Sequence, residues 1–124
     1  MLQVISLAIK DTNLSSSASK ILQSEIDHVG VVNTWTWNYP DLPGLVAENL
    51  GVRPRSKVLS HHGGDSPAKL FDEAARRIAR GESKVAVITG GEALASRMFG
   101  LSYYVICVAS IGGNGMEKML ILDL

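Results

Sequence analysis

The stretch KVLSHHGGDSPAKLFDEAARRIARGESKVAVIT, residues 57–89, decides the fold of this chain. Its central part predicts a helix, because apolar residues recur there at spacings of three and four. The members of that stripe are Leu70, Phe71, Ala74, Ala75 and Ile78. Apolar residues in Lys57–His61 and Lys84–Thr89 predict a strand on either side of the helix. The run Val-Ala-Val-Ile in the second strand is typical of a strand buried on both faces of a parallel sheet.

The ends of this central helix are also marked in the sequence. Asp65 or Ser66 can cap its start through a side-chain oxygen, and Pro67 suits its first turn. Gly81 can end it. Two acid–arginine pairs spaced four residues apart lie on the outer face, where they favour a solvated helix surface.

The residues before this stretch predict two short helices, a strand and a third helix. In order, they are a helix from Met1 to near Asn13, a serine-rich loop at Leu14–Ser19 whose serines can cap a helix through Ile26, a strand at Asp27–Thr36, and a helix at Leu45–Leu50 with Gly51 as its left-handed cap. Pro40 and Pro43 are expected to separate the strand from the third helix. The alternation of strands and helices indicates an α/β fold with a mostly parallel sheet and covering helices.

The character of the sequence changes after Gly100. Tyr103–Ile111 and Met119–Leu124 are apolar, and Gly112–Gly115 lies between them. The Asn-Gly pair in that segment is a strong signal for a tight turn, so we expect a C-terminal β-hairpin.

Composition narrows the class of protein. The 124 residues suit one domain, and 12 basic and 12 acidic side chains give a formal net charge of zero. A nucleic-acid binder would need a basic stripe, so no nucleic-acid partner is expected. The single cysteine, Cys107, excludes a disulfide within the chain and favours a reducing compartment. No run of about 18 apolar residues is present, so we expect no membrane span.

Three stretches, taken together in their order and spacing, resemble the thiolase superfamily. They are VVNTWTWNYPDLPGLVAE at Val31–Glu48, HHGGDSP at His61–Pro67 and ARGESKVAVITGGEA at Ala79–Ala93. Within that superfamily, the chain is similar to acetyl-CoA acetyltransferase-like proteins related to sterol-carrier-protein thiolases. The resemblance covers roughly residues 1–97. It divides the chain into a partial thiolase-like N-terminal domain, residues 1–100, and a divergent apolar tail, residues 101–124.

The resemblance implies a layered αβα fold and acyl transfer on coenzyme A thioesters. In thiolases a cysteine nucleophile lies in the turn between a strand and a helix, where the helix N-terminus favours the thiolate. No resident cofactor is implied, since the coenzyme A thioester is the substrate. The implied partners are acyl-CoA and a second thiolase-like chain, either as a homo-dimer or with a fuller relative. We expect a cytoplasmic location, with the peroxisome as the alternative.

Two departures from the family pattern limit these expectations. Gly63 or Gly64 stands about where the nucleophile would be, so covalent acyl transfer of the usual kind is not available. The family's opening strand and its second half, with its catalytic groups, have no counterpart in this sequence. We therefore expect an acyl-CoA-handling protein that is inactive as this chain. The alternative is a non-catalytic dimerisation or interaction module, and whether the chain is an enzyme stays open.

The candidate site is the turn before the central helix. His62 is the candidate proton carrier, and the candidate substrate-binding residues are His61, Gly63, Gly64, Asp65 and Ser66. The glycine pair and the helix start would form an oxyanion-stabilising corner. The plainer alternatives are that one histidine is packed and the other solvated, since neighbouring strand residues face opposite sides. Asp65 and Ser66 are more commonly caps than catalytic groups.

Two other groups of residues bear on possible binding roles. Trp35, Trp37 and Tyr39 can line an acyl pocket or a protein interface, or can simply pack under a loop. The three histidines and Asp65 do not follow the spacing of zinc ligands, so no metal site is expected.

Overall fold

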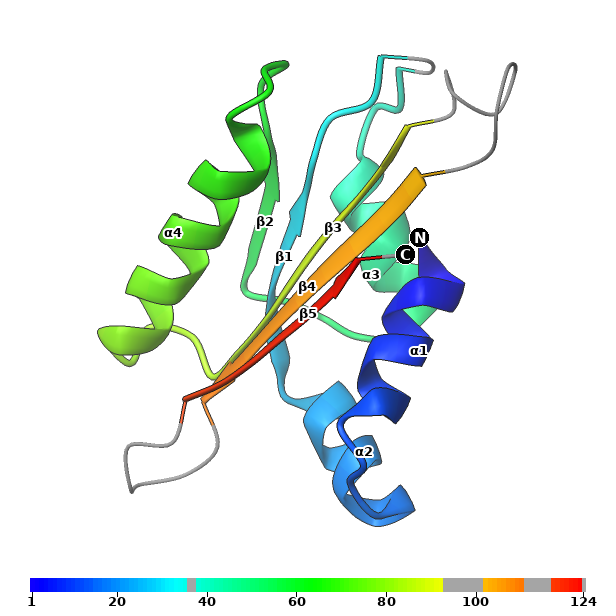
Figure 1. Cartoon of the computed structure of the whole chain (residues 1–124), viewed down its shortest axis with the longest axis vertical. Helices are drawn as coiled ribbons and strands as arrows, with labels where there is room; N and C mark the ends of the chain where they lie inside the picture. The colour runs from blue at the N-terminus through cyan, green and yellow to red at the C-terminus, as the bar shows by residue number, and fades with distance from the viewer. Residues whose placement is uncertain (36–37, 93–101, 111–116, 124) are drawn as a thin grey trace.

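The computed structural model describes residues 1–35, 38–92, 102–110 and 117–123. Its elements are, in order, α1 (Leu2–Asp11), α2 (Ser16–Ser24), β1 (Ile26–Val31), α3 (Leu42–Leu50), β2 (Ser56–Leu59), α4 (Ser66–Ala79), β3 (Val85–Glu92), β4 (Ser102–Ser110) and β5 (Glu117–Asp123). The strands form one sheet in the order β2-β1-β3-β4-β5. Helix α4 lies on one side of this sheet, and α1, α2 and α3 lie on the other (Figure 1).

The first three strands of the sheet are parallel, as the sequence predicts. In register, Val29 of β1 lies opposite Lys57 of β2 on one side and Val87 of β3 on the other. Strand β4 then pairs antiparallel with β3, and β5 pairs antiparallel with β4. The α/β class and the C-terminal hairpin are confirmed, while the residues of its connecting turn, 111–116, lie outside the described part of the chain.

Strand β3 is apolar at consecutive positions because both of its faces are covered. Val85 and Val87 belong to the core that β1 and β3 share with α1, α2 and α3. Ala86 and Ile88 alternate with them and pack under α4. Val87 and Ile88 are fully buried, so the prediction of a two-sided buried strand is confirmed.

Helices α2 and α3 both begin with a residue whose side chain caps the helix. Ser15 caps α2 by accepting a hydrogen bond from the Ala18 N–H at 3.3 Å, as predicted. Asp41 caps α3 through the Gly44 N–H at 2.9 Å, so that helix begins at Leu42, earlier than the expected Leu45. The helix extends upstream because a proline is tolerated in the first turn, where its missing N–H is not needed.

The capping prediction for α4 is wrong. Asp65 occupies the cap position, but its side chain makes no capping hydrogen bond. Its backbone is already close to the right-handed helical conformation, with φ −90° and ψ −6°, whereas a capping residue is normally extended. Ser66 is the first residue of the helix, and its hydroxyl donates to the His61 carbonyl oxygen at 2.8 Å.

Strands β1 and β2 are both shorter than expected. Strand β2 ends at Leu59, so neither histidine of the following turn belongs to it. The argument from alternating strand faces therefore does not apply to them, and both are exposed. Strand β1 ends at Val31, and the chain then enters the loop before α3.

Among the residues that the structure describes, no helix is long and apolar enough to cross a membrane.

Candidate functional site

The candidate site is the turn of residues 61–66, which joins the end of β2 to the start of α4 (Figure 1). The three parallel strands end on this side of the sheet. In open α/β sheets, ligands bind outside the carboxyl ends of the parallel strands. A helix N-terminus at the same place adds free N–H groups and the positive end of a helix dipole. The fold therefore places the predicted residues where a ligand can reach them.

Two serine hydroxyls hold the turn through one carbonyl group. The Ser60 and Ser66 hydroxyls each donate to the His61 carbonyl oxygen at 2.8 Å. The oxygen of Ser60 also accepts a hydrogen bond from the Asn33 N–H at 3.0 Å, which ties the turn to the loop after β1. Both serines are buried, with 8% and 1% of their surface exposed. Sequence reasoning missed Ser60, although a small polar residue at the end of an apolar strand was a usable signal.

The two glycines give the turn an open backbone. A Cβ atom built on Gly64 would meet no atom within 4 Å. A Cβ on Gly63 would lie 2.8 Å from Oδ1 of Asp65, an exposed side chain that can move. The Ser66 N–H is already used, since it donates to the Gly63 carbonyl oxygen at 3.1 Å. In the described part of the chain, the N–H groups of the two glycines donate to no other residue.

Asp65 faces solvent and is held by a lysine one helical turn away. Its carboxylate lies 2.5 Å from Nζ of Lys69, and both side chains are more than half exposed. The hydrogen bond from Lys69 is the main cause that lowers the pKa of Asp65 below its ordinary value. The carboxylate is therefore ionised at neutral pH, and it is not placed to act as an acid.

His62 contacts an aromatic residue from the loop after β1. Its ring centroid lies 4.3 Å from that of Trp35, with the two ring planes inclined by 33°. Trp35 remains 68% exposed, so this pair forms a surface feature beside the turn. Of the three aromatics considered together in the sequence, Tyr39 lines a groove elsewhere and Trp37 lies outside the described residues.

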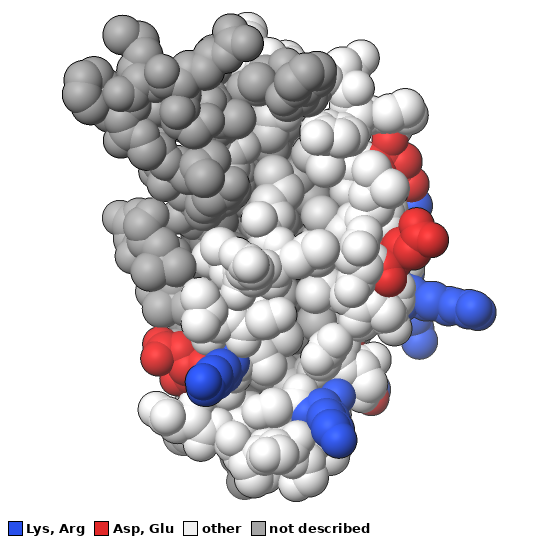
Figure 2. Space-filling model, turned by 90° about the vertical axis from the view of Figure 1, so that its right-hand side faces the viewer, with Lys and Arg blue, Asp and Glu red and all other residues white. Residues whose placement is uncertain are grey.

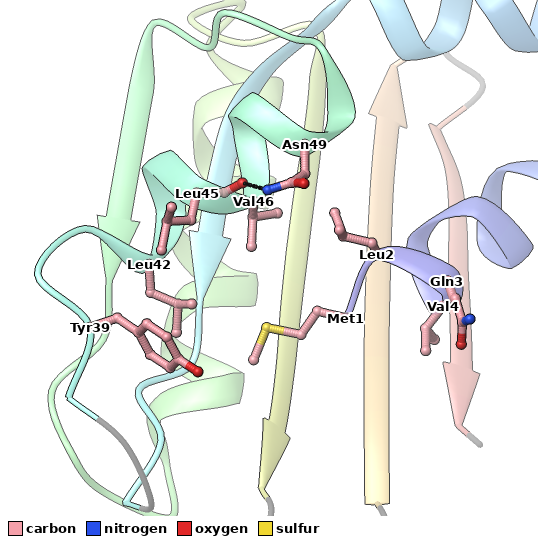
Figure 3. A pocket seen from close by; sticks show the side chains of 9 residues that line it. All are labelled: Met1, Leu2, Gln3, Val4, Tyr39, Leu42, Leu45, Val46 and Asn49. Carbon is pink, nitrogen blue, oxygen red and sulfur yellow. Dashed lines mark hydrogen bonds between the residues drawn. The ribbon is translucent and has the colours of Figure 1, made fainter.

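That groove, which we call the α1–α3 groove, lies between the N-terminal end of α1 and the helix α3. Its volume is about 510 Å³. It is lined by Met1, Leu2, Gln3, Val4, Tyr39, Leu42, Leu45, Val46 and Asn49. Figure 3 shows side chains from α1, α3 and the loop before α3 surrounding it. Sequence reasoning did not find this groove, because its two walls lie about 40 residues apart in the chain.

A buried histidine lies under α4 and apart from both features. His28 of β1 is 1% exposed, and neither of its ring nitrogens has a hydrogen-bond partner in the described part of the chain. Burial is the main cause that lowers its pKa, and the nearby Arg77 guanidinium lowers it further. No group of three or more His, Cys, Asp or Glu side chains among the described residues is arranged to hold a metal ion.

Comparisons with known proteins place the fold. No family model matches this chain, and no curated protein matches it. Among solved structures, a monomeric SCP2-thiolase-like protein from Mycobacterium smegmatis shares 34% identity over 60% of this chain, with a TM-score of 0.51. A variant of OleA from Xanthomonas campestris shares 23% identity over 73% of the chain, with a TM-score of 0.56. Another OleA variant, with bound lauric acid and lauroyl-CoA, shares 23% identity over 68%, with a TM-score of 0.50.

The chain spans 15% of the length of the first of these relatives and 26% of the other two. The matches agree with the α/β architecture, in which three parallel strands are covered by helices on both faces. They also agree with the resemblance carried by the sequence stretches around residues 31–48, 61–67 and 79–93. The chain therefore carries one part of a thiolase-like αβα fold.

Proposed function

We propose that this chain binds acyl-CoA thioesters at the turn of residues 61–66 and does not itself form a covalent acyl intermediate. The observation that carries the proposal is the position of the turn, at the carboxyl end of β2 and the N-terminus of α4. The solved relatives of similar fold are thiolase-like proteins, and one of them has lauroyl-CoA bound. The absence of a cysteine in the turn argues against covalent transfer.

The chemistry proposed for the turn is polarisation of a thioester carbonyl. An oxyanion site needs N–H donors that are not already engaged. The Ser66 N–H is engaged and Pro67 has none, so the donors in this proposal are the N–H groups of Gly63 and Gly64. His62 is proposed as the proton carrier beside them. His61 contributes through its carbonyl group, which the two serine hydroxyls hold in place.

The first experiment is a calorimetric titration of the purified chain with coenzyme A and with acetyl-CoA. Saturable binding of acetyl-CoA that is tighter than that of coenzyme A would support a site for the thioester carbonyl. Mass spectrometry after incubation should find no acetyl thioester in the turn, because it contains no cysteine. No binding of either ligand to the folded chain would refute the proposal.

A matched pair of variants at one position separates the N–H donor from the bulk of a side chain. Gly64→Ala should retain acetyl-CoA binding, since a Cβ there meets nothing within 4 Å. Gly64→Pro removes the donor, and the loss of one hydrogen bond of about 1 kcal/mol should weaken binding about fivefold. Equal binding by the two variants, with unchanged circular dichroism, would exclude the Gly64 N–H as a donor.

A second candidate function is a non-catalytic association module, which the edge strand β2 favours. This strand pairs only with β1 within the described sheet, and Leu59 at its end is 37% exposed. An edge strand presents unpaired backbone groups that another chain can pair with. Sedimentation should then show a homo-dimer, or a complex with a fuller thiolase-like chain. A monomer at high concentration would argue against the homo-dimer.

For either function we propose the cytoplasm as the compartment, with the peroxisome as the alternative.

A further inference from the structure

We propose that the turn of residues 61–66 hydrolyses acyl-CoA thioesters, with water as the nucleophile and His62 as the base that takes up its proton. The inference rests on the proposed function, because it requires the thioester to bind at this turn. It goes further by giving the chain a reaction that needs neither a cysteine nor a covalent intermediate. Three features of the turn support it: its serine hydroxyls are engaged, the ring of His62 contacts Trp35, and the N–H groups of its glycine pair have no protein partner in the described part of the chain.

The hydroxyl and carboxylate groups of the turn are already engaged. The hydroxyls of Ser60 and Ser66 both donate to the His61 carbonyl oxygen at 2.8 Å, and these serines are 8% and 1% exposed. The carboxylate of Asp65 is paired with Lys69. Residues 61–65 are all exposed, so water reaches a thioester that is bound there. Because both hydroxyls are buried and donate to a carbonyl group, water is the nucleophile that remains.

The imidazole of His62 is oriented by a neighbour but makes no polar contact. Its ring centroid lies 4.3 Å from that of Trp35, with the ring planes inclined by 33°. In the described part of the chain, no hydrogen bond or ion pair involves the His62 side chain, so its ring nitrogens remain free to bind water. A neutral imidazole accepts a proton near neutral pH. Trp35 is therefore a positioning residue, which limits the rotation of the ring beside the glycine pair.

The reaction is balanced without any further reactant. The water oxygen attacks the thioester carbon, and one water proton moves to a ring nitrogen of His62. The electron pair of the carbonyl double bond moves to oxygen, which accepts hydrogen bonds from the N–H groups of Gly63 and Gly64. The carbonyl then re-forms and the carbon–sulfur bond breaks. Its electron pair goes to sulfur, which takes the proton from His62. The products are a carboxylic acid and the thiol of coenzyme A.

Recognition in this reaction is assigned to the thioester and not to the phosphates of coenzyme A. Figure 2 looks onto the side that carries α1, α2 and α3, where the charged side chains lie toward the lower part and along one edge. On the other side of the sheet, the first two cations of α4 are already paired, Lys69 with Asp65 and Arg76 with Asp72 at 2.7 Å. S-acetyl-N-acetylcysteamine, a thioester without phosphates, should therefore be hydrolysed as well. Hydrolysis of acetyl-CoA alone would overturn this assignment.

The test measures the release of free coenzyme A from acetyl-CoA by the full chain, with a thiol reagent and in parallel with a calorimetric titration. A sample without ligand is subtracted, since Cys107 also carries a thiol. We expect release above the rate in buffer, and no acetylated serine in acid-quenched samples by mass spectrometry. Saturable binding without release would overturn this inference and leave the proposed function standing, whereas no binding would overturn both. Acetylated Ser66 would overturn water as the nucleophile.

Substitution of His62 tests the proton transfer. His62→Ala should lower the rate of hydrolysis about 100-fold, a typical contribution of a general base. Added imidazole should restore part of the rate in this variant, beyond its own reaction with acetyl-CoA in buffer, because the position is exposed and the substitution leaves room. If His62→Ala does not fold, His62→Gln replaces it and should lose the rate while it keeps acetyl-CoA binding. An unchanged rate, or a lost rate that imidazole does not restore, would overturn the role of His62.

A matched pair of variants at position 35 tests the positioning role. Trp35→Phe keeps an aromatic ring against His62 and should retain the rate. Trp35→Ala lets the imidazole rotate and should lower the rate about fivefold, the effect of losing one aromatic pair, with the affinity for acetyl-CoA unchanged. Tyr39→Ala is the control, because it removes a half-exposed aromatic side chain that lines the α1–α3 groove and not the turn. Equal rates in the two Trp35 variants, or an equal loss in Tyr39→Ala, would overturn the positioning role.

Discussion

Replacing His28 by leucine should stabilise the fold and reduce its sensitivity to acid. The histidine is 1% exposed and lies on the face of β1 that α4 covers. Its Nε2 would lie 3.7 Å from a Cβ built on Gly30, so the ring fills its space. The charged groups that act on it are Arg77 and Glu73 of α4 and Asp27 of its own strand. Neither ring nitrogen has a hydrogen-bond partner in the described part of the chain.

The magnitude follows from these contacts. A buried polar group without a partner costs about 1–3 kcal/mol. Leucine is close to histidine in volume, and a change of shape in a packed core typically costs up to about 1.5 kcal/mol. The net expectation for His28→Leu at neutral pH is a gain of about 1 kcal/mol in the free energy of unfolding.

The dependence on pH has a definite sign. Burial lowers the pKa of His28 in the folded chain below its ordinary value of 6.5, so the unfolded chain takes up a proton first as the pH falls. The wild type therefore keeps its full stability above pH 6.5 and loses it as the pH falls from there toward the folded-state pKa. The loss from this one group is at most about 1.4 kcal/mol per pH unit.

The assay is urea unfolding of wild type and His28→Leu at pH 7.5 and at pH 5.5. Other titrating groups act equally in both proteins, so the difference between them isolates His28. His61→Leu is the control, because it makes the same substitution at an exposed histidine. An identical loss of stability between the two pH values in wild type and His28→Leu would refute the reasoning.

Three further predictions concern backbone and hydrogen bonds, and urea unfolding checks each of them. Gly51→Ala should lower the free energy of unfolding by about 1 kcal/mol, because Gly51 ends α3 with φ +69°, a conformation that alanine adopts less readily. An added Cβ would meet no atom within 4 Å, so no steric clash adds to this effect. An unchanged free energy of unfolding would contradict the left-handed cap. Ser66→Ala should cost about 1 kcal/mol, because it removes a hydrogen bond to the His61 carbonyl oxygen but leaves the one from Ser60; a cost above about 3 kcal/mol would mean that more than this bond is lost. Asp27→Ala should cost about 2 kcal/mol, because its carboxylate accepts from the Lys84 N–H at 2.9 Å and from the Ser83 hydroxyl; Asp27→Asn should recover part of that loss, and equal losses would argue against these bonds.

The parts of the fold that follow from nearby residues could be predicted from the sequence. The run Val-Ala-Val-Ile indicated a strand covered on both faces, and β3 is such a strand. Ser15 and Gly51 lie at the helix ends that their chemistry favours. The cap of α4 could not be predicted in the same way, because Asp65 has a local alternative in the ion pair with Lys69. Residue type alone does not decide between these two partners.

The candidate site was predictable in its place but not in its contacts. The order of strand, glycine pair and helix located the turn of residues 61–66. The contact between the rings of His62 and Trp35 joins residues from two different loops. It could not be predicted from the spacing of residues in the sequence. The same holds for His28, whose burial depends on α4 packing across β1. Contacts between distant segments depend on how the layers are stacked, and that information is not local.

The order of the sheet also bears on how the chain acquires its structure during synthesis. Strand β1 is made before both of its neighbours in the sheet, and the pairing of Val29 with Val87 closes a loop of about 60 residues. Until β3 has left the ribosome, β1 lacks one of its two neighbours, and Val29 and Val31 cannot reach their fully buried positions. Until β3 is made, the nascent chain therefore carries an apolar strand that is incompletely paired, and transiently exposed apolar segments of this kind are prone to aggregation and are bound by chaperones.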